Sequence, residues 1–312
     1  MLMGRLGPHY NRRCKEVSFE KALLSSLWTL SNQDSYREIG DRFGIAKSSF
    51  CKVFHYITKL ICDILANTVS WPQGNKVNEI ILKFSNLGFP GTVGAIDGTF
   101  ITIDKPRERD VQNPDNYFNR KSYFSITMIA TCDTDLNFTY VYAGGPSRFH
   151  DSRVFYLSSL GQMITETPLH LFQNEDQHII GDTGFPLSRH LMTPYKNNGH
   201  LSNAQKTYNT NLSKARQVIE RAFGLLKCRF RRLRHLQMNT IANCVKAVHA
   251  ATILHNICLQ NEYPDELNNE NDFNEDDVDD PDVPNLFAPN LERIQSATDK
   301  RNQLKDSYAI NR

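Results

Sequence analysis

The chain has 312 residues, 40% of them hydrophobic, and a formal net charge of only +2 at neutral pH. This length allows one sizeable core and a small accessory domain. Seven cysteines are scattered without a C-x-x-C pair, and no apolar run is long enough to span a bilayer. These features exclude a disulfide-rich secreted domain and a transmembrane protein, so we expect a soluble protein of the nucleus or cytoplasm.

The small net charge conceals a split along the chain. The segment 262–282 contains eleven acidic residues and no Lys or Arg, so the rest of the chain carries a balance of +13. A chain with that excess of positive charge favours a polyanionic partner.

The N-terminal part contains the pattern of a small helical domain. Residues 1–16 are short and basic, and we expect them to be flexible. Residues 17–69 have apolar residues at helical spacing, with a tight turn at Gly44 between two helices. Ser35 with Glu38 three residues later is a capping-box signature at the start of the first helix. A helix, a glycine-containing turn and a second helix together predict a helix-turn-helix domain.

A helix-turn-helix of this kind would place the start of its second helix in the major groove or against its phosphates. The residues expected to make these contacts are Lys47, Ser48, Ser49 and Lys52. The pattern alone does not establish binding, and a helical packing module without DNA contact remains the alternative.

Residues 70–90 contain several Pro and Gly and are expected to connect this domain to a second one at residues 91–260, with a short helix at Val77–Phe84. There, small and apolar residues from Thr92 lead into Asp97, and apolar alternation resumes after Gly98. This pattern predicts a buried strand with one charge near its middle. Such a charge must be paired, hydrogen-bonded or bound to a metal. The alternative is a carboxylate that caps a turn before Gly98.

Two alternating apolar segments follow, at 122–132 and 137–143, with a turn between them. They predict a β-hairpin whose aspartates serve the turn. Asp151 then begins a helix that runs to about Leu160. Capping a helix N-terminus is the commonest role for Asp at such a position.

Two more carboxylates occur in settings like that of Asp97. The short apolar strand His178–Ile180 runs into Asp182, and Glu220 lies on a helix predicted over residues 209–230. Two aspartates at strands and a glutamate on a later helix form a set of hard oxygen ligands. Such a set suits Mg²⁺ or Mn²⁺.

The helix around Glu220 lies in a basic tract. Between Lys206 and Arg234 there are nine basic residues, and Glu220 is the one acid. A solvated helical face is the simpler interpretation of charges, but a bias of one sign with apolar residues between favours binding to a phosphate backbone. The residues expected to bind DNA here are Arg229, Arg231 and Arg232. After a further helix at 241–259, the acidic residues of the 261–312 tail predict a largely disordered segment.

Several short motifs occur around these residues: GAIDGT, GDTGFPL followed by LMTPY, ERAFGLLKCRFRRL, HDS and LHN. In these motifs the chain resembles the PIF/Harbinger transposases and the Harbinger transposase-derived nucleases. The resemblance covers roughly residues 17–259. It departs from the family at Phe100, where many members have His, and at Phe185, where Tyr is usual.

The resemblance implies an α/β fold: a ribonuclease-H-like catalytic domain, with a mixed sheet flanked by helices, that follows the all-α helix-turn-helix domain. It maps the family's Asp-Asp-Glu metal-binding triad onto Asp97, Asp182 and Glu220. It also gives Asp151 a role as a fourth, accessory metal contact, which is compatible with capping a helix.

The function implied is that of a divalent-metal-dependent endonuclease of the transposase type acting on double-stranded DNA in the nucleus. A domesticated, catalytically silent DNA-binding or scaffold protein is the main alternative. A transcription-factor-like reader would rest on residues 35–56 alone. The resemblance also implies a Myb-like protein partner, and no membrane association is expected. The oligomeric state is left open, with a homodimer as one candidate.

Overall fold

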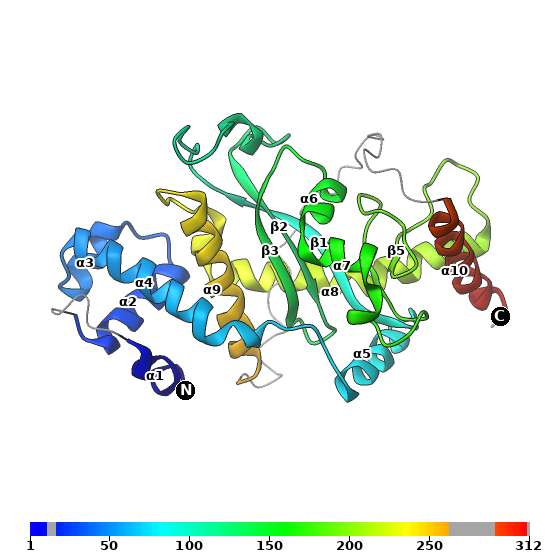
Figure 1. Cartoon of the computed structure of the whole chain (residues 1–312), viewed down its shortest axis with the longest axis horizontal. Helices are drawn as coiled ribbons and strands as arrows, with labels where there is room; N and C mark the ends of the chain where they lie inside the picture. Colours follow the sequence, from blue (N-terminus) through cyan, green and yellow to red (C-terminus); the bar gives the residue numbers. More distant parts are fainter. Residues whose placement is uncertain (11–16, 262–290, 311–312) are drawn as a thin grey trace.

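The centre of the molecule is a mixed five-stranded sheet with helices on both faces (Figure 1). The computed structural model describes residues 1–10, 17–261 and 291–310. The strand order is β3-β2-β1-β4-β5, in which the pairs β3–β2 and β2–β1 are antiparallel and the pairs β1–β4 and β4–β5 are parallel. The strands are β1 (Thr92–Thr102), β2 (Ser125–Cys132), β3 (Phe138–Pro146), β4 (His178–Ile180) and β5 (Leu191–Met192). The predicted α/β class is confirmed.

The hairpin β2–β3 follows the sequence pattern closely. Its turn is closed by Asp133, whose Oδ1 accepts hydrogen bonds from the backbone N–H of Asp135 at 2.9 Å and of Asn137 at 3.0 Å. Leu136 adopts a left-handed φ of 64° in this turn. Both aspartates therefore serve the turn, as the sequence predicted.

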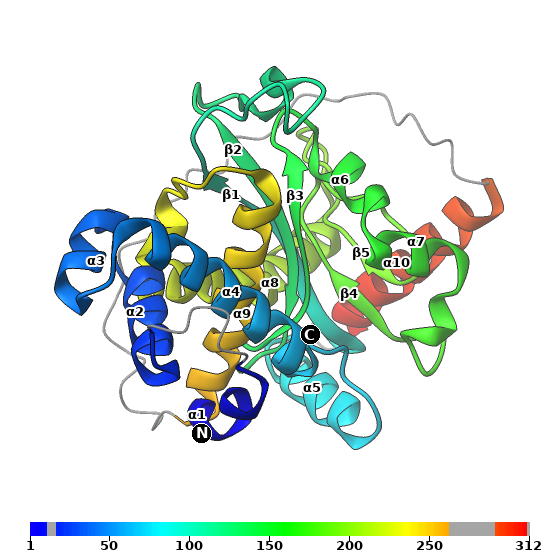
Figure 2. The same ribbon diagram turned by 60° about the vertical axis from the view of Figure 1, so that its left-hand side comes forward.

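Two layers of helices enclose the sheet, and alternate residues of β1 face them. Ala95 packs into the core shared with α8 (Asn203–Arg229) and α9 (Ile241–Leu259). Ile96, the next residue, packs into the core under α6 (Asp151–Leu157) and α7 (Ser159–Glu166). Figure 2 shows α8 and α9 on one side of the strands and α6 and α7 on the other. The sequence predicted one helix from Asp151 to about Leu160, but the structure has two. Ser158 between them has an extended backbone and caps the start of α7.

The N-terminal helices pack beside α9 rather than on the sheet. They are α2 (Phe19–Ser31), α3 (Tyr36–Phe43) and α4 (Lys47–Leu65). Ser35 and Glu38 form the predicted capping box, and Gly44 has a left-handed φ of 59° at the end of α3. That this unit is a DNA-binding helix-turn-helix stays a prediction.

The expectation of a flexible N-terminus is wrong for the first residues. Leu2–Leu6 form helix α1, which a 3-10 turn (Gly7–His9) follows. Leu6 is fully buried in the main core, and the Tyr10 ring lies 5.2 Å from that of Phe19. Apolar burial therefore holds this segment in spite of its basic composition. Residues 11–16 lie outside the described part.

The connector at 70–90 contains the short helix predicted at Val77–Phe84, and that helix is slightly longer than predicted. It contains helix α5 (Asn75–Asn86), preceded by a 3-10 turn (Ala66–Thr68) after α4. The helix packs on β1 and buries Val77, Ile80 and Phe84.

The predicted disordered tail contains an ordered helix, α10 (Leu291–Ile310), which packs against α8. Its anchor is Lys300, whose ammonium donates to the carbonyls of Glu175 at 2.7 Å, Arg189 at 2.8 Å and Gln177 at 3.2 Å. Burial lowers the pKa of Lys300 to about 7. The Arg301 guanidinium stacks 4.1 Å above the ring centre of Tyr195. The correction applies to 291–310; the acidic residues 262–290 lie outside the described part.

Among the helices that the structure describes, none is long and apolar enough to cross a membrane.

One buried amide ties the helical unit to the sheet. Asn256 accepts a hydrogen bond from the Phe138 N–H at 2.9 Å and donates to the Phe138 carbonyl at 2.8 Å. It also donates to the carbonyl of Thr68, at the end of the turn that follows α4, at 3.0 Å. This is a physical reason for the LHN motif at residues 254–256.

Replacing this amide should destabilise the whole chain. Asn256→Leu keeps the volume but leaves one N–H and two carbonyls without their partner, which should cost about 2–4 kcal/mol of unfolding free energy. Gln260→Leu, at an exposed position beyond the same helix, is the control and should change stability by less than about 0.5 kcal/mol. Urea denaturation of the three proteins measures both effects, and equal stabilities would show that the amide is dispensable.

Candidate active site around Asp97

The carboxylate of Asp97 lies in the middle of β1, paired in register with Ala130 of β2. The strand continues through Gly98 to Thr102, so the alternative that Asp97 caps a turn is wrong. The side chain is only 15% exposed. Its Oδ1 accepts a hydrogen bond from the Gly98 N–H at 2.8 Å. A strand that is buried on both faces thus carries a charge close to its centre, which requires a counter-charge.

That counter-charge is Arg216 of α8. One guanidinium nitrogen donates to Asp97 Oδ2 at 2.6 Å, and another lies 2.6 Å from Glu220 Oε1. The Arg216 side chain is 11% exposed, while that of Glu220 is 46% exposed. Arg216 and Glu220 are one helical turn apart, the pairing that the sequence allows on a helix. One buried cation therefore joins two of the three predicted triad carboxylates.

Asp182 and Asp151 approach the same site from other elements. Asp182 follows β4, and its Oδ1 accepts a hydrogen bond from the Gly184 N–H at 3.0 Å. Asp151 is the first residue of α6, and a Cβ at Gly98 would lie 2.7 Å from its Oδ1. Gly98 therefore allows Asp151 to approach β1 directly beside Asp97.

These groups together determine the protonation of Asp97. Burial raises its pKa well above the ordinary value, and the Arg216 guanidinium opposes that effect. The negative charges of Asp182 and Asp151 raise the pKa further. An added positive charge at this point would relieve the repulsion among the three aspartates.

The carboxylates have the chemistry of a divalent-cation site, since hard oxygen donors suit Mg²⁺ and Mn²⁺. In the described ranges 1–10, 17–261 and 291–310, however, no three His, Cys, Asp or Glu side chains form a group that could hold a metal ion. Arg216 lies between Asp97 and Glu220 instead. The donors fit the ion in kind, and their role as its ligands stays a prediction.

A second polar contact between α8 and β1 lies close by. Lys227 donates from its ammonium to Thr99 Oγ1 at 2.6 Å. Neither the contact of Lys227 with Thr99 nor the pairing of Arg216 with Asp97 is predicted from the sequence. The signal was present, because Asp97 and Thr99 alternate onto one face of a strand, and residues 216, 220 and 227 fall on one face of a helix.

The predicted DNA-binding residues of α4 lie at its exposed start. Lys47, Ser48 and Lys52 are exposed, and Ser49 is partly buried. No side chain of the described residues caps this helix N-terminus, which begins after Ala46. The position is therefore accessible to a phosphate group.

The three arginines after Glu220 have different environments. Arg231 is exposed. Arg229 is partly buried, and its guanidinium lies 3.2 Å from Nδ1 of His255. Arg232 is 2% exposed, donates to the carbonyl of Asp34 at 2.9 Å, and lies over the Tyr36 ring. Arg232 therefore joins the helical unit to the second domain, and its burial argues against the predicted DNA contact.

Comparison with known proteins agrees with this architecture. A family model described as "DDE superfamily endonuclease" matches residues 96–256, a range that runs from β1 through Asp97, Asp182 and Glu220 to Asn256. The chain belongs to this family. The mixed sheet flanked by helices is consistent with a DDE nuclease domain.

Curated relatives specify the family further. An Arabidopsis thaliana protein named "Protein ALP1-like" is 29% identical over 79% of this chain and 62% of its own length. Two further relatives, from Rattus norvegicus and Homo sapiens, carry the name HARBI1, and their full name proposes that they are nucleases. Each is 27% identical over 83% of this chain, and the match covers 72% and 73% of their own lengths. The chain thus spans less than two thirds of the Arabidopsis relative. No solved structure matches it. These relatives confirm the resemblance to the Harbinger transposase-derived nucleases.

Removing the buried Arg216 cation should lower the unfolding free energy, because Asp97 loses its counter-charge. Arg216→Met should lower the unfolding free energy of the metal-free protein by about 3–5 kcal/mol at neutral pH, because a buried charge is left without its partner. Burial already raises the pKa of Asp97 in the wild type, and loss of the Arg216 charge should raise that pKa further. Ionising Asp97 as pH rises therefore costs the variant more stability than it costs the wild type. The deficit should therefore be larger near pH 8 than near pH 5, as measured by urea denaturation.

Lys59→Met, which removes an exposed cation paired with Asp63 on α4, is the control and should show a small deficit at both pH values. A deficit of Arg216→Met that does not change with pH would show that poorer packing, rather than the charge of Asp97, causes it.

Proposed function

We propose that the protein is a divalent-metal-dependent DNA endonuclease of the transposase type, with Asp97, Asp182 and Glu220 as its catalytic carboxylates. The observation that carries this proposal is the buried Asp97 carboxylate at the centre of the sheet, next to Asp182 and Asp151, in a chain of the DDE endonuclease family. A structural carboxylate would not need two further acids in its surroundings.

In this proposal Asp97, Asp182 and Glu220 hold the metal ions, with Asp151 as an accessory contact. Bound Mg²⁺ or Mn²⁺ would supply Lewis acidity at the scissile phosphate and activate water. The protein's own part would be positioning: Asp97 lies on β1, Asp182 follows β4, and Arg216 joins Asp97 to Glu220 of α8. The part of α8 that follows Glu220 is basic, with Arg221 exposed and Lys227 partly buried. This positive charge favours the approach of a phosphate backbone.

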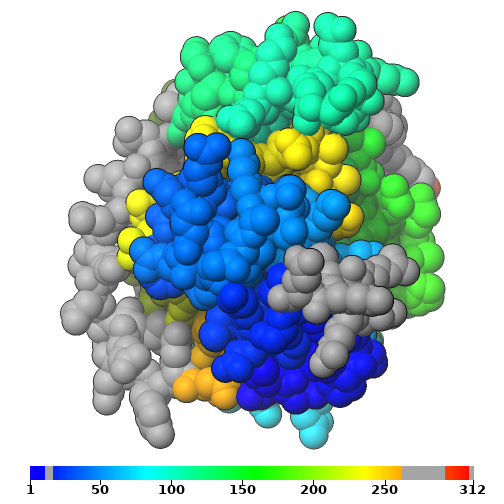
Figure 3. All heavy atoms as spheres, turned by 90° about the vertical axis from the view of Figure 1, so that its left-hand side faces the viewer, coloured from blue at the N-terminus to red at the C-terminus, as the bar shows by residue number. Residues whose placement is uncertain are grey.

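DNA would be held mainly outside the site. Lys47 and Lys52 are exposed at the start of α4, where uncapped backbone N–H groups favour a phosphate. Figure 3 shows this end of the molecule, with α1–α4 in blue, the segment between β1 and β2 in teal, and the region around the start of α9 in yellow between them. A duplex lying over this end would contact both the helical unit and the catalytic domain.

The rival proposal is a domesticated protein that binds DNA or other proteins without cleaving. The intact carboxylates at residues 97, 182 and 220 favour the enzyme, because a silent scaffold has no use for a buried acid at this point. The location in the nucleus, a Myb-like partner and a homodimer stay predictions.

Loss of any of the three carboxylates should abolish cleavage without abolishing binding. Asp97→Asn, Asp182→Asn and Glu220→Gln should each lower the rate of Mg²⁺-dependent cleavage of labelled duplex DNA on the order of a thousandfold or more. Asp135→Asn, in the exposed turn after β2, is the matched control and should keep full activity. Cleavage by Asp97→Asn at the wild-type rate would contradict the assignment of the triad.

Replacing the exposed lysines on α4 should weaken DNA binding and should also reduce the dependence of the affinity on salt concentration. The double variant Lys47→Ala with Lys52→Ala should flatten the slope of log affinity against log salt by up to about 0.9 for each phosphate that the variant no longer neutralises. Lys59→Ala, on the same helix but already paired with Asp63, should leave the slope nearly unchanged. Anisotropy titrations at several salt concentrations measure the slope, and equal slopes for all three proteins would exclude α4 from the DNA interface.

A further inference from the structure

A cavity of about 670 Å³ opens directly beside Asp151 and is separate from the triad itself. Its volume is in the range of small-molecule sites. The wall is made by the loop between β1 and β2, the end of β3 and the start of α6, and its members are mainly aromatic or basic. The lining includes Phe100, Phe118, Phe124, Arg120, Arg148 and Asp151.

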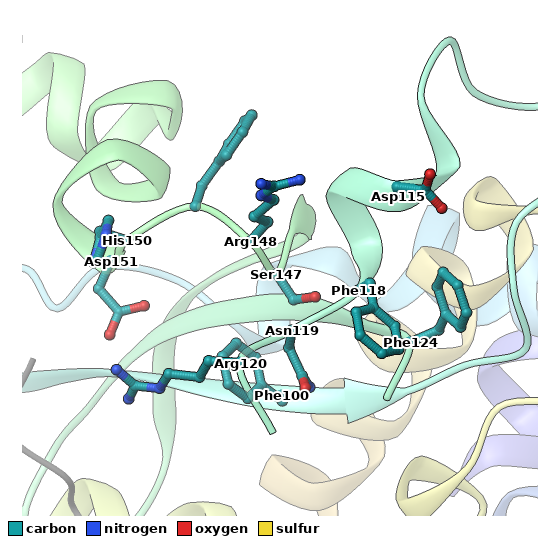
Figure 4. Close-up of a pocket in the computed structure, with 11 residues that line it drawn as sticks. Phe100, Asp115, Phe118, Asn119, Arg120, Phe124, Ser147, Arg148, His150 and Asp151 are labelled. Atoms are coloured by element: carbon teal, nitrogen blue, oxygen red, sulfur yellow. The ribbon is translucent and has the colours of Figure 1, made fainter. Parts of the chain in front are cut away.

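Two phenylalanines form one end of this cavity. Phe118 and Phe124 pack edge to face with ring centres 5.1 Å apart, and an isolated backbone bridge joins them. Phe118 is nevertheless 42% exposed, an unusual state for a large aromatic ring. Figure 4 shows Phe118 and Phe124 at one end of the pocket and Asp151 at the other, with Phe100 and Arg120 between them in this view.

Two polar side chains in the wall of the cavity, Asn119 and Ser147, are already hydrogen-bonded within the protein. The Asn119 carbonyl oxygen accepts from the N–H of Lys121 at 2.9 Å, and its amide donates to Ser125 Oγ at 2.7 Å. The Ser147 hydroxyl donates to the Tyr117 carbonyl at 2.9 Å. These groups are therefore committed to shaping the cavity, and they offer little capacity for reading the edge of a particular ligand.

The rim carries positive charge. Arg120 and Arg148 are exposed, and Asp115, the acid at the far side, is paired with Lys105 at 3.2 Å. A ligand that combines a flat apolar face with a phosphate would match a cavity with rings inside and guanidinium groups at its edge.

We propose that this cavity binds one unstacked nucleobase of the DNA, held on the rings of Phe118 and Phe124 beside the scissile phosphate. The proposal rests on the proposed nuclease function, because the cavity and the carboxylates share Asp151. Every base has an aromatic face, and Asn119 and Ser147 are already hydrogen-bonded within the protein. The cavity should therefore bind any unpaired base in preference to a paired one, with little sequence selectivity.

Extracting a base from a duplex costs unstacking and unpairing energy, and a base that is already unpaired avoids that cost. The experiment is an anisotropy titration in EDTA, so that no cleavage occurs. The probes are a fully paired duplex and the same duplex with one unpaired nucleotide, and wild type should bind the second more tightly.

Phe118→Leu keeps apolar bulk but removes the ring, and it should weaken binding of the unpaired-nucleotide probe by roughly five- to a hundredfold. Phe118→Tyr keeps the ring and should behave as wild type. Leu169→Ala, at a hydrophobic residue 63% exposed outside the cavity lining, is the control and should also behave as wild type. Thermal melts of all variants check that each is folded.

Tight binding of both probes with equal affinity, unchanged in Phe118→Leu, would overturn the pocket proposal and leave the proposed nuclease function standing. Failure of wild type to bind either probe would overturn the DNA-directed function and the pocket proposal with it. A reduction in affinity that is equal for the two probes would show that Phe118 serves the duplex surface, which also overturns the proposal.

Discussion

The structure depends on one ion pair between the sheet and its longest helix. Asp97 is nearly enclosed by β1 and its neighbours, and its charge is tolerable because Arg216 reaches it from α8. This contact fixes both the rotation and the axial position of a 27-residue helix against the sheet. Glu220 is paired with the same guanidinium, so the relative position of these two carboxylates depends on a single buried cation.

Much of this architecture was predictable from local patterns. The strand through Asp97, the β2–β3 hairpin and helices α8 and α9 follow from the alternation or helical spacing of apolar residues. The capping box at Ser35 and the turn at Asp133 follow from residue types that bond to nearby backbone. In each case the residues that determine the element lie within a few positions of each other.

The features that the sequence did not predict join distant parts of the chain. In the sequence, Arg232 is one of several arginines in a basic tract. In the structure its guanidinium donates to the carbonyl of Asp34, 198 residues earlier. Helix α10 follows an acidic segment and has a polar sequence, but its Lys300 donates hydrogen bonds to three carbonyls more than 100 residues away. Such contacts depend on which surfaces the fold brings together, and the composition of a single segment does not carry that information.

The position of α4 has a geometric consequence. The helix has 19 residues, which is about 28 Å at 1.5 Å per residue, and it packs against α2, α3 and α9. Its C-terminal end leads into Thr68, whose carbonyl accepts a hydrogen bond from Asn256 beside β3, while Lys47 is exposed at the N-terminal end. The length of α4 therefore sets the distance between the exposed Lys47 and the point where Asn256 joins the helical unit to the sheet.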